Sequence, residues 1–196
     1  MTKLRHLIFD TEYFIFIKTM SGHSHWAGIK HKKEISDQKR GQLFSKLVNA
    51  ISIAARTETN PDFNPRLRTV IEKAKENKVP QEKIDSALKR ASENKNLEEL
   101  VIESYGPEGA AILIEAITDS KNRTIAEVRK ILNDHEAKLA EPGSVLWAFE
   151  QIKTDSGFSW QEKFKQPISI KAQEKIQKLI QELLEQNDVQ EIYTNT

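Results

Sequence analysis

The chemistry that this sequence offers is concentrated in one short stretch, MSGHSHWAGIKHKK, which occupies positions 20–33. The stretch contains three lysines and three histidines. Closely spaced cations neutralise phosphates and release counterions, which gives salt-dependent binding to nucleic acids. We therefore predict that this stretch contacts a phosphate backbone through Lys30, His31, Lys32 and Lys33.

Trp26, in the same stretch, has two interpretations of about equal weight. It would stack on an unpaired base, as aromatic residues of nucleic-acid-binding modules do. Alternatively, it would anchor the stretch onto neighbouring helices together with Ile29. Gly22 and Gly28 predict points at which the backbone turns or approaches a phosphate closely.

The histidines also raise the alternative of a metal site. His23 and His25 come close together only in an extended segment, and His31 would have to fold back to join them. No carboxylate signature completes such a set, and the chain contains no cysteine. Metal binding is therefore the minor interpretation, and we expect neither a metal nor another cofactor.

Signatures of catalysis are missing from the sequence. It contains no glycine-rich phosphate loop and no nucleophile elbow, and without cysteine it has no thiol chemistry. The acidic residues recur at the spacing of solvated helix surfaces. We therefore expect a protein that is not an enzyme.

Charge is divided unevenly along the chain. Residues 20–91 contain 15 Lys and Arg against 8 Asp and Glu, a net charge of +7, whereas residues 92–196 contain 12 against 19, a net charge of −7. A basic half of this kind predicts a polyanionic partner for that half. The lack of cysteine fits a reducing compartment, so we expect a cytoplasmic protein.

The first nineteen residues differ in character from the rest. Residues 7–17, LIFDTEYFIFI, are apolar, but they include Asp10 and Glu12, and no small-residue cleavage site follows them. The segment is also too short and too charged to span a bilayer, so no membrane association is expected. We interpret residues 1–19 as an extension outside the core, with Met20 as the usual first residue; the alternative is an extra element docked on the body.

Three short amphipathic helices are predicted in the basic half, because apolar residues recur there at helical spacing. Asn64 and Pro65 predict the start of the second helix, and Pro80 that of the third. Three such helices with short links form a small bundle. The polar faces add further predicted phosphate contacts: Lys39, Arg40, Lys46, Arg66 and Arg68.

The acidic half predicts the order β-β-α-β-β-α-β. We expect strands at 100–105, 110–118 and 188–193, a turn followed by a strand at 142–150, and an extended segment at 158–170. A capping box formed by Thr124 and Glu127 predicts the start of one helix, and Ser169 predicts the start of the other. The fold class is therefore α+β, with an N-terminal helical bundle followed by a ferredoxin-like sandwich. The expected domains are residues 20–96 and 97–196.

Four segments together resemble the YebC/PmpR family. They are MSGHSHWAGIKHKKEISDQKRGQLFSKL (20–47), NPRLRTVIEKAKENKVP (64–80), SYGPEGAAILIEAITDSKNRTIAEVRK (104–130) and DVQEIYTN (188–195). The resemblance implies a helical domain followed by two α+β lobes, the last inserted within the second. Since the closing segment follows soon after residues 149–151, the inserted lobe is predicted to be missing. The resemblance also implies a probable transcriptional regulator, or a translation factor that acts on ribosomes.

We therefore expect a nucleic-acid-binding regulator of gene expression. Ribosomal RNA is favoured as the target, because the basic half shows no helix-turn-helix with a base-reading helix. The alternatives are a transcriptional regulator that binds duplex DNA, and an adaptor that docks on a protein through its acidic half. The oligomeric state stays open.

Overall fold

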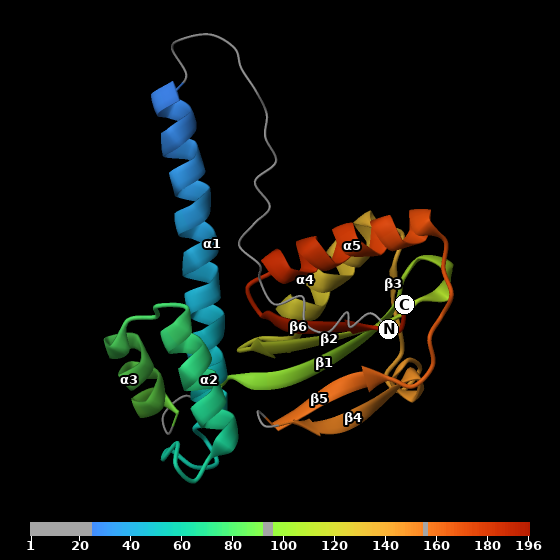
Figure 1. Cartoon of the computed structure of the whole chain (residues 1–196). Coiled ribbons are helices and arrows are strands. Elements are labelled where there is room, and N and C mark those ends of the chain that lie inside the picture. Colours follow the sequence, from blue (N-terminus) through green and yellow to red (C-terminus); the bar gives the residue numbers. More distant parts are fainter. Residues whose placement is uncertain (1–24, 92–95, 155–156) are drawn as a thin grey trace, which may run out of the picture. The chain divides into compact units, whose positions relative to one another are not determined.

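Three helices form the N-terminal part of the chain. The computed structural model describes residues 25–91, 96–154 and 157–196, with side chains described from Ser36 onward. The helices are α1 (His25–Ala54), α2 (Pro65–Glu76) and α3 (Gln81–Arg90), as Figure 1 shows. Asp37–Thr196 form one compact unit, to which the packing described below belongs.

The first helix is longer than predicted. It contains 30 residues, so it is not a short helix, and Gly28 lies inside it rather than at a turn. The segment has no proline, and each of its two glycines, Gly28 and Gly41, costs only about 1 kcal/mol, which neighbouring good helix formers offset. Gly22 lies outside the described residues.

The start of the second helix is confirmed in detail. The Asn64 side chain accepts a hydrogen bond from the backbone N–H of Leu67 at 3.0 Å, and Pro65 occupies the first helical position. The amide of Asn64 also donates to the carbonyls of Ala54 and Glu58, both at 2.8 Å. The buried Asn64 side chain thus binds backbone carbonyls at and after the end of α1 and caps the start of α2. The bundle core contains the predicted apolar faces, with Ile51, Leu67, Ile84 and Ala87 almost fully buried.

A four-stranded antiparallel sheet forms the centre of the second part. Its strands are β1 (Glu98–Tyr105), β2 (Ala111–Thr118), β3 (Lys138–Leu139) and β6 (Val189–Thr194), in the order β3-β1-β2-β6. The hairpin of β1 and β2 is closed by a 3-10 turn, Pro107–Gly109. The predicted strands at 100–105, 110–118 and 188–193 are therefore confirmed.

The two faces of the sheet are covered differently, as Figure 1 shows. Helices α4 (Lys121–Asp134) and α5 (Ile170–Glu185) pack on one face, where Ile112 and Ile114 of β2 meet apolar residues of both helices. The other face, with Ala111 and Leu113, packs against Val145, Ala148 and Phe149. The prediction of an α+β sandwich with its helices on one side is confirmed.

A turn and then a strand are present at 142–150 as predicted, but this strand and the one within 158–170 lie outside the main sheet, which corrects the expectation of a single sandwich sheet. The two strands are β4 (Phe149–Thr154) and β5 (Gly157–Glu162), which pair only with each other in a separate two-stranded sheet. Glu103 explains the turn before β4: it is buried and accepts backbone hydrogen bonds from residues 143–146, which therefore cannot continue a strand.

The capping box predicted at Thr124 is also wrong. Helix α4 begins at Lys121 after Ser120, and Thr124 is fully buried in its first turn. The Thr124 hydroxyl donates to the carboxylate of Asp188 at 2.7 Å. By contrast, Ser169 caps α5 as predicted, because its hydroxyl accepts from the backbone N–H of Ala172.

Candidate nucleic-acid interface

The strongest predicted phosphate contacts lie at the beginning of α1. The backbone there is helical, but the side chains of residues 25–35 are outside the described part. The roles of Lys30, His31, Lys32, Lys33 and Trp26 therefore stay predictions. The same holds for the metal alternative at His23, His25 and His31. Among the described side chains, no group of three His, Asp or Glu comes together in a way that would hold a metal ion.

Arg40 lies on the exposed surface of α1. No hydrogen bond or ion pair joins it to another described residue. An exposed guanidinium, with five N–H donors in a planar fork, suits the binding of a phosphate.

Lys39 and Arg66 are engaged with the acidic half of the chain. Lys39 Nζ lies 3.3 Å from Glu185 Oε1, and Arg66 pairs with Glu99. A third pair joins Lys73 and Glu191 at 3.7 Å. All six side chains are substantially exposed, so each pair contributes little to stability. A polyanion can therefore compete with these carboxylates for the same cations.

Arg68 is bound to the loop before α2. Its Nε donates to the carbonyl of Pro61 and its Nη2 to that of Asp62, both at 3.1 Å. These two bonds hold the guanidinium in place at the surface. The other N–H groups of the guanidinium do not take part in them. The predicted contact at Arg68 is compatible with this geometry.

Lys46 does not lie on an exposed face, contrary to the prediction. Its side chain is 7% exposed, and its ammonium donates to the carbonyl of Leu184 in the last turn of α5 at 2.5 Å. Burial lowers the pKa of Lys46 to about 8, and the negative charge of Asp188 opposes part of this shift. Lys46 thus satisfies a terminal helix carbonyl and is not accessible to a phosphate.

The pH dependence of stability is expected to report this burial. Between about pH 7.5 and pH 9.5, Lys46 loses its proton in the folded chain, whereas an unfolded lysine keeps it up to about pH 10.4. The unfolded state then binds more protons, so the free energy of unfolding rises with pH, by on the order of 1–2 kcal/mol.

Urea denaturation at both pH values would measure this rise, and Lys46→Met would remove it. Lys83→Met, at an exposed lysine of α3, is the control that should retain it. An equal rise in wild type and Lys46→Met would show that Lys46 titrates normally.

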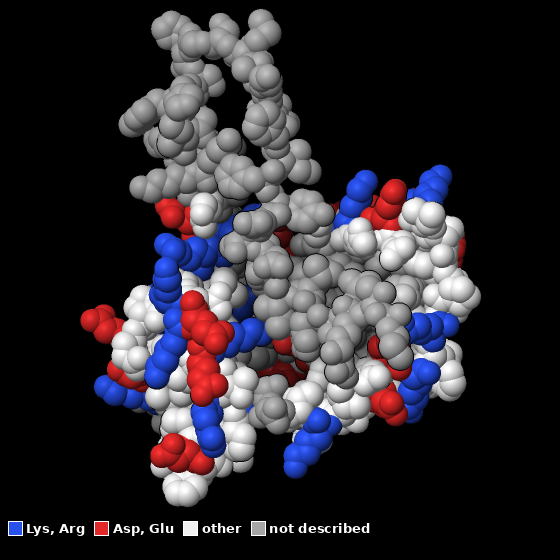
Figure 2. Space-filling view, viewed as in Figure 1, with Lys and Arg blue, Asp and Glu red and all other residues white. Residues whose placement is uncertain are grey.

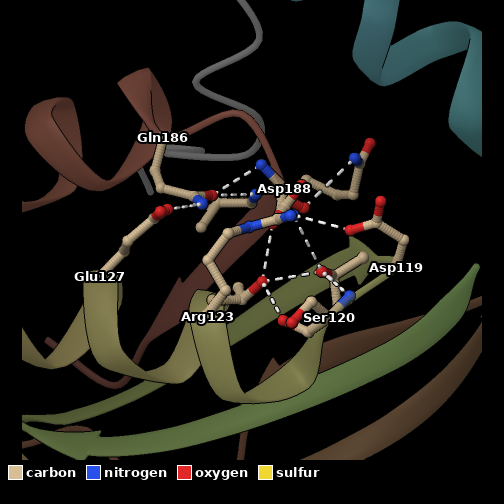
Figure 3. A network of polar contacts seen from close by, with 10 residues as sticks. Asp119, Ser120, Arg123, Glu127, Gln186 and Asp188 are labelled. Carbon is tan, nitrogen blue, oxygen red and sulfur yellow. Dashed lines mark hydrogen bonds and ion pairs between the residues drawn. The ribbon is translucent and has the colours of Figure 1, made fainter.

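A polar cluster at the start of α4 was missed by sequence reasoning. Figure 3 shows Arg123 reaching toward Asp119 and Asp188, with both ion pairs at 2.9 Å. Burial works to raise the pKa of Asp188, but hydrogen bonds from Thr124 and Arg123 and the charge of Arg123 outweigh it, so this pKa lies below its ordinary value. The only sequence signal was the Asn-Arg-Thr segment at 122–124.

This cluster borders a polar cavity of about 280 Å³. The cavity is lined by Asn49, Asn96, Leu97, Asp119, Arg123 and Asp188. Because two carboxylates neutralise its one guanidinium, the cavity offers no excess positive charge to an anion. Its residues come from α1, the residues just before β1, the start of α4 and the residue before β6.

The fold and the charge distribution define a class: a helical bundle with exposed cations, followed by an α+β sandwich. Two models of one family match the chain, the TACO1/YebC protein N-terminal domain over residues 24–94 and the TACO1/YebC second and third domain over residues 97–154. The chain therefore belongs to the TACO1/YebC family, as the motifs predicted.

Relatives and a solved structure agree with this assignment. A "Probable transcriptional regulatory protein" of Desulfosudis oleivorans is 47% identical over 136 residues, which cover 67% of this chain and 55% of the relative. One of the same name from Chloroherpeton thalassium is 52% identical over 136 residues, covering 67% of this chain and 54% of the relative. The crystal structure of a conserved hypothetical protein from Aquifex aeolicus matches with a TM-score of 0.73 and 28% identity, over 80% of this chain and 90% of that one.

The chain spans about half the length of the curated relatives it matches. Those relatives are named as regulators, in agreement with the expectation that this protein is not an enzyme. Among the described residues, no helix has both the length and the apolar character needed to cross a membrane.

Proposed function

We propose that this chain is a non-enzymatic, nucleic-acid-binding regulator of gene expression that acts on ribosomal RNA. The observation that carries the proposal is the surface of the helical bundle. Residues 37–91 contain 12 Lys and Arg against 7 Asp and Glu, and of these cations only Lys46 is buried. Figure 2 shows Lys and Arg side chains spread over the bundle, with Asp and Glu between them. Such a surface suits binding to a phosphate backbone.

The third helix favours RNA over base reading in duplex DNA. In a helix-turn-helix protein the N-terminal residues of the second helix contact base edges in the major groove. The first turn and a half of α3 contains Glu82 and Asp85, and the Asp85 carboxylate accepts a hydrogen bond from Gln81 at 2.9 Å. Two carboxylates at this end would face the phosphates that line the groove. Scattered cations instead fit recognition of RNA by its shape and backbone.

Duplex DNA is the second candidate target, because the relatives are named as transcriptional regulatory proteins. An adaptor role for the acidic half is a third candidate, favoured by its excess of carboxylates. Some of these carboxylates are already paired within the chain, since Glu99, Glu185 and Glu191 form ion pairs with cations of the bundle. A ribosome-associated role would place the protein in the cytoplasm, as the cysteine usage predicts.

Charge reversal at the start of α1 tests the proposal. The Lys30/Lys32/Lys33→Glu variant is expected to lower affinity for ribosomal RNA by at least about a hundredfold at moderate salt, because three phosphate contacts are lost. The matched control is Lys130/Lys171/Lys178→Glu, which makes the same charge change at exposed positions of α4 and α5.

Affinity would be measured by fluorescence anisotropy with a labelled rRNA fragment. The control should bind within a few fold of wild type. An equal loss in both variants would mean that net charge alone governs binding, and an unchanged affinity in the first variant would favour the adaptor.

A further inference from the structure

Two exposed aromatic rings lie together on the face of the second part that carries the β4–β5 hairpin. Trp147 and Phe164 are each 59% exposed, and their ring centroids are 6.0 Å apart at a tilt of 39°. Burying rings of this size is strongly favourable, so two that remain half in solvent and touch each other mark a surface with a partner.

The Trp147 ring is held in place by rigid surroundings. Val145 and Ala148, its near neighbours in the chain, are fully buried. The indole N–H donates to the carbonyl of Ser144 at 2.8 Å, and Tyr105 donates its hydroxyl to the same carbonyl at 2.7 Å. The buried core therefore fixes the loop, and the loop presents the indole outward.

The carboxylate of Glu103 fixes that loop from below. It accepts the backbone N–H groups of Gly143 at 2.5 Å, Val145 at 2.6 Å and Leu146 at 2.9 Å. Phe164 is tied to the same loop, because the backbone N–H of Lys163 donates to the carbonyl of Ala148 at 2.8 Å. The two rings are thus preorganised, and binding a flat partner would order little that is not ordered already.

Cations lie on both sides of Phe164 in the sequence Lys163-Phe164-Lys165. Both lysines are exposed. Lys165 is 76% exposed in its side chain and approaches Glu162 only to 3.8 Å, so this pair restrains it weakly. Rings flanked by exposed cations match a base that stacks while its phosphates are neutralised.

From these observations we propose that Trp147 and Phe164, with Lys163 and Lys165, form a stacking platform for unpaired nucleotides. The indole N–H already donates a hydrogen bond to Ser144, so a ligand would contact the faces of the ring. Stacking on ring faces tolerates any base, and the platform therefore binds single strands with little sequence preference. The inference rests on the proposed function and adds a second contact, for the single-stranded part of the same target.

The test uses the full chain with two RNA probes of equal length, a fluorescent single-stranded oligoadenylate and a blunt duplex. Trp147→Ala is expected to weaken single-strand binding about five- to fiftyfold and to leave duplex binding within about twofold, because one stacked base is lost. Trp147→Phe keeps a ring and should restore much of the affinity. Lys163/Lys165→Gln should lower the slope of log affinity against log salt by up to about two.

The matched control is Phe158→Ala, which removes another exposed ring from the same hairpin. It should bind the single strand as wild type does. Equal affinities of wild type and Trp147→Ala for the single strand would overturn the platform and leave a protein as the occupant of these rings. In that case the proposed function would still stand if Lys30/Lys32/Lys33→Glu lost binding; wild type that binds neither probe would end both proposals.

Discussion

Replacing Glu103 with alanine is expected to lower the free energy of unfolding by about 3 kcal/mol, because three backbone N–H groups, that of Val145 fully buried, lose a charged acceptor. The carboxylate is 6% exposed and accepts three backbone N–H bonds from residues 143–146. Water cannot replace it at Val145, which is fully buried. In a unit of this size the loss corresponds to a melting temperature lower by roughly 6–12 °C.

Thermal melts followed by circular dichroism would measure the effect. Glu103→Gln tests the chemistry more narrowly, because its amide keeps one acceptor oxygen but turns an NH₂ group toward the other donors; it should lose nearly as much. Glu150→Gln, at an exposed position of β4, is the control and should change stability by less than about 0.5 kcal/mol. A melting temperature of Glu103→Ala within a degree or two of wild type would refute this role of the carboxylate.

The second large effect is expected at Asp188. Its carboxylate accepts from Thr124 at 2.7 Å and from Arg123 at 2.9 Å, and it is buried. Asp188→Asn keeps the shape but replaces one acceptor by a donor, so we expect a loss of about 2 kcal/mol at neutral pH. Asp119→Asn is the matched control, since Asp119 is exposed and pairs with the same arginine; it should have little effect.

Acid adds a signature that a purely steric effect would not produce. Because the pKa of Asp188 is lowered on folding, its contribution is complete above the unfolded pKa of about 3.9 and is lost as pH falls through the folded value. The stability difference between wild type and Asp188→Asn should therefore shrink below about pH 4. Urea denaturation at neutral pH and in acid would measure it, and a difference that stays constant would contradict the proposed hydrogen bonds.

Local signals in the sequence sufficed for most elements of the fold. Asn64, Pro80 and Ser169 marked helix starts correctly because each acts on backbone groups within three or four residues. Thr124 gave a wrong prediction because only local spacing was considered. Its spacing to Glu127 is that of a capping box, but its hydroxyl donates a hydrogen bond to Asp188, 64 positions away. The separation of β4 and β5 from the main sheet likewise depends on Glu103, a long-range anchor.

The candidate site shows the same limit. Residue type identified the cations, but contacts between distant segments decide which of them are accessible. Lys46 is spaced like its neighbours on α1, yet it is buried against the end of α5, and Lys39 and Arg66 face carboxylates of the acidic half. Part of the positive charge that predicted an external polyanion is therefore paired with carboxylates of the acidic half of the same chain. The aromatic pair of Trp147 and Phe164 left no signal, because the two residues are 17 positions apart in the sequence, on either side of the β4–β5 hairpin.

The most direct test of the central claim is sedimentation of residues 20–196 with ribosomes from the source cell, beside titration of a promoter-length DNA duplex across the same salt series. We predict tight co-sedimentation that weakens steeply with salt, is lost in Lys30/Lys32/Lys33→Glu, and exceeds duplex binding under each condition. Preferential binding to the duplex would contradict the ribosomal assignment and support transcriptional regulation. Binding to neither would contradict the claim that the helical bundle recognises nucleic acid.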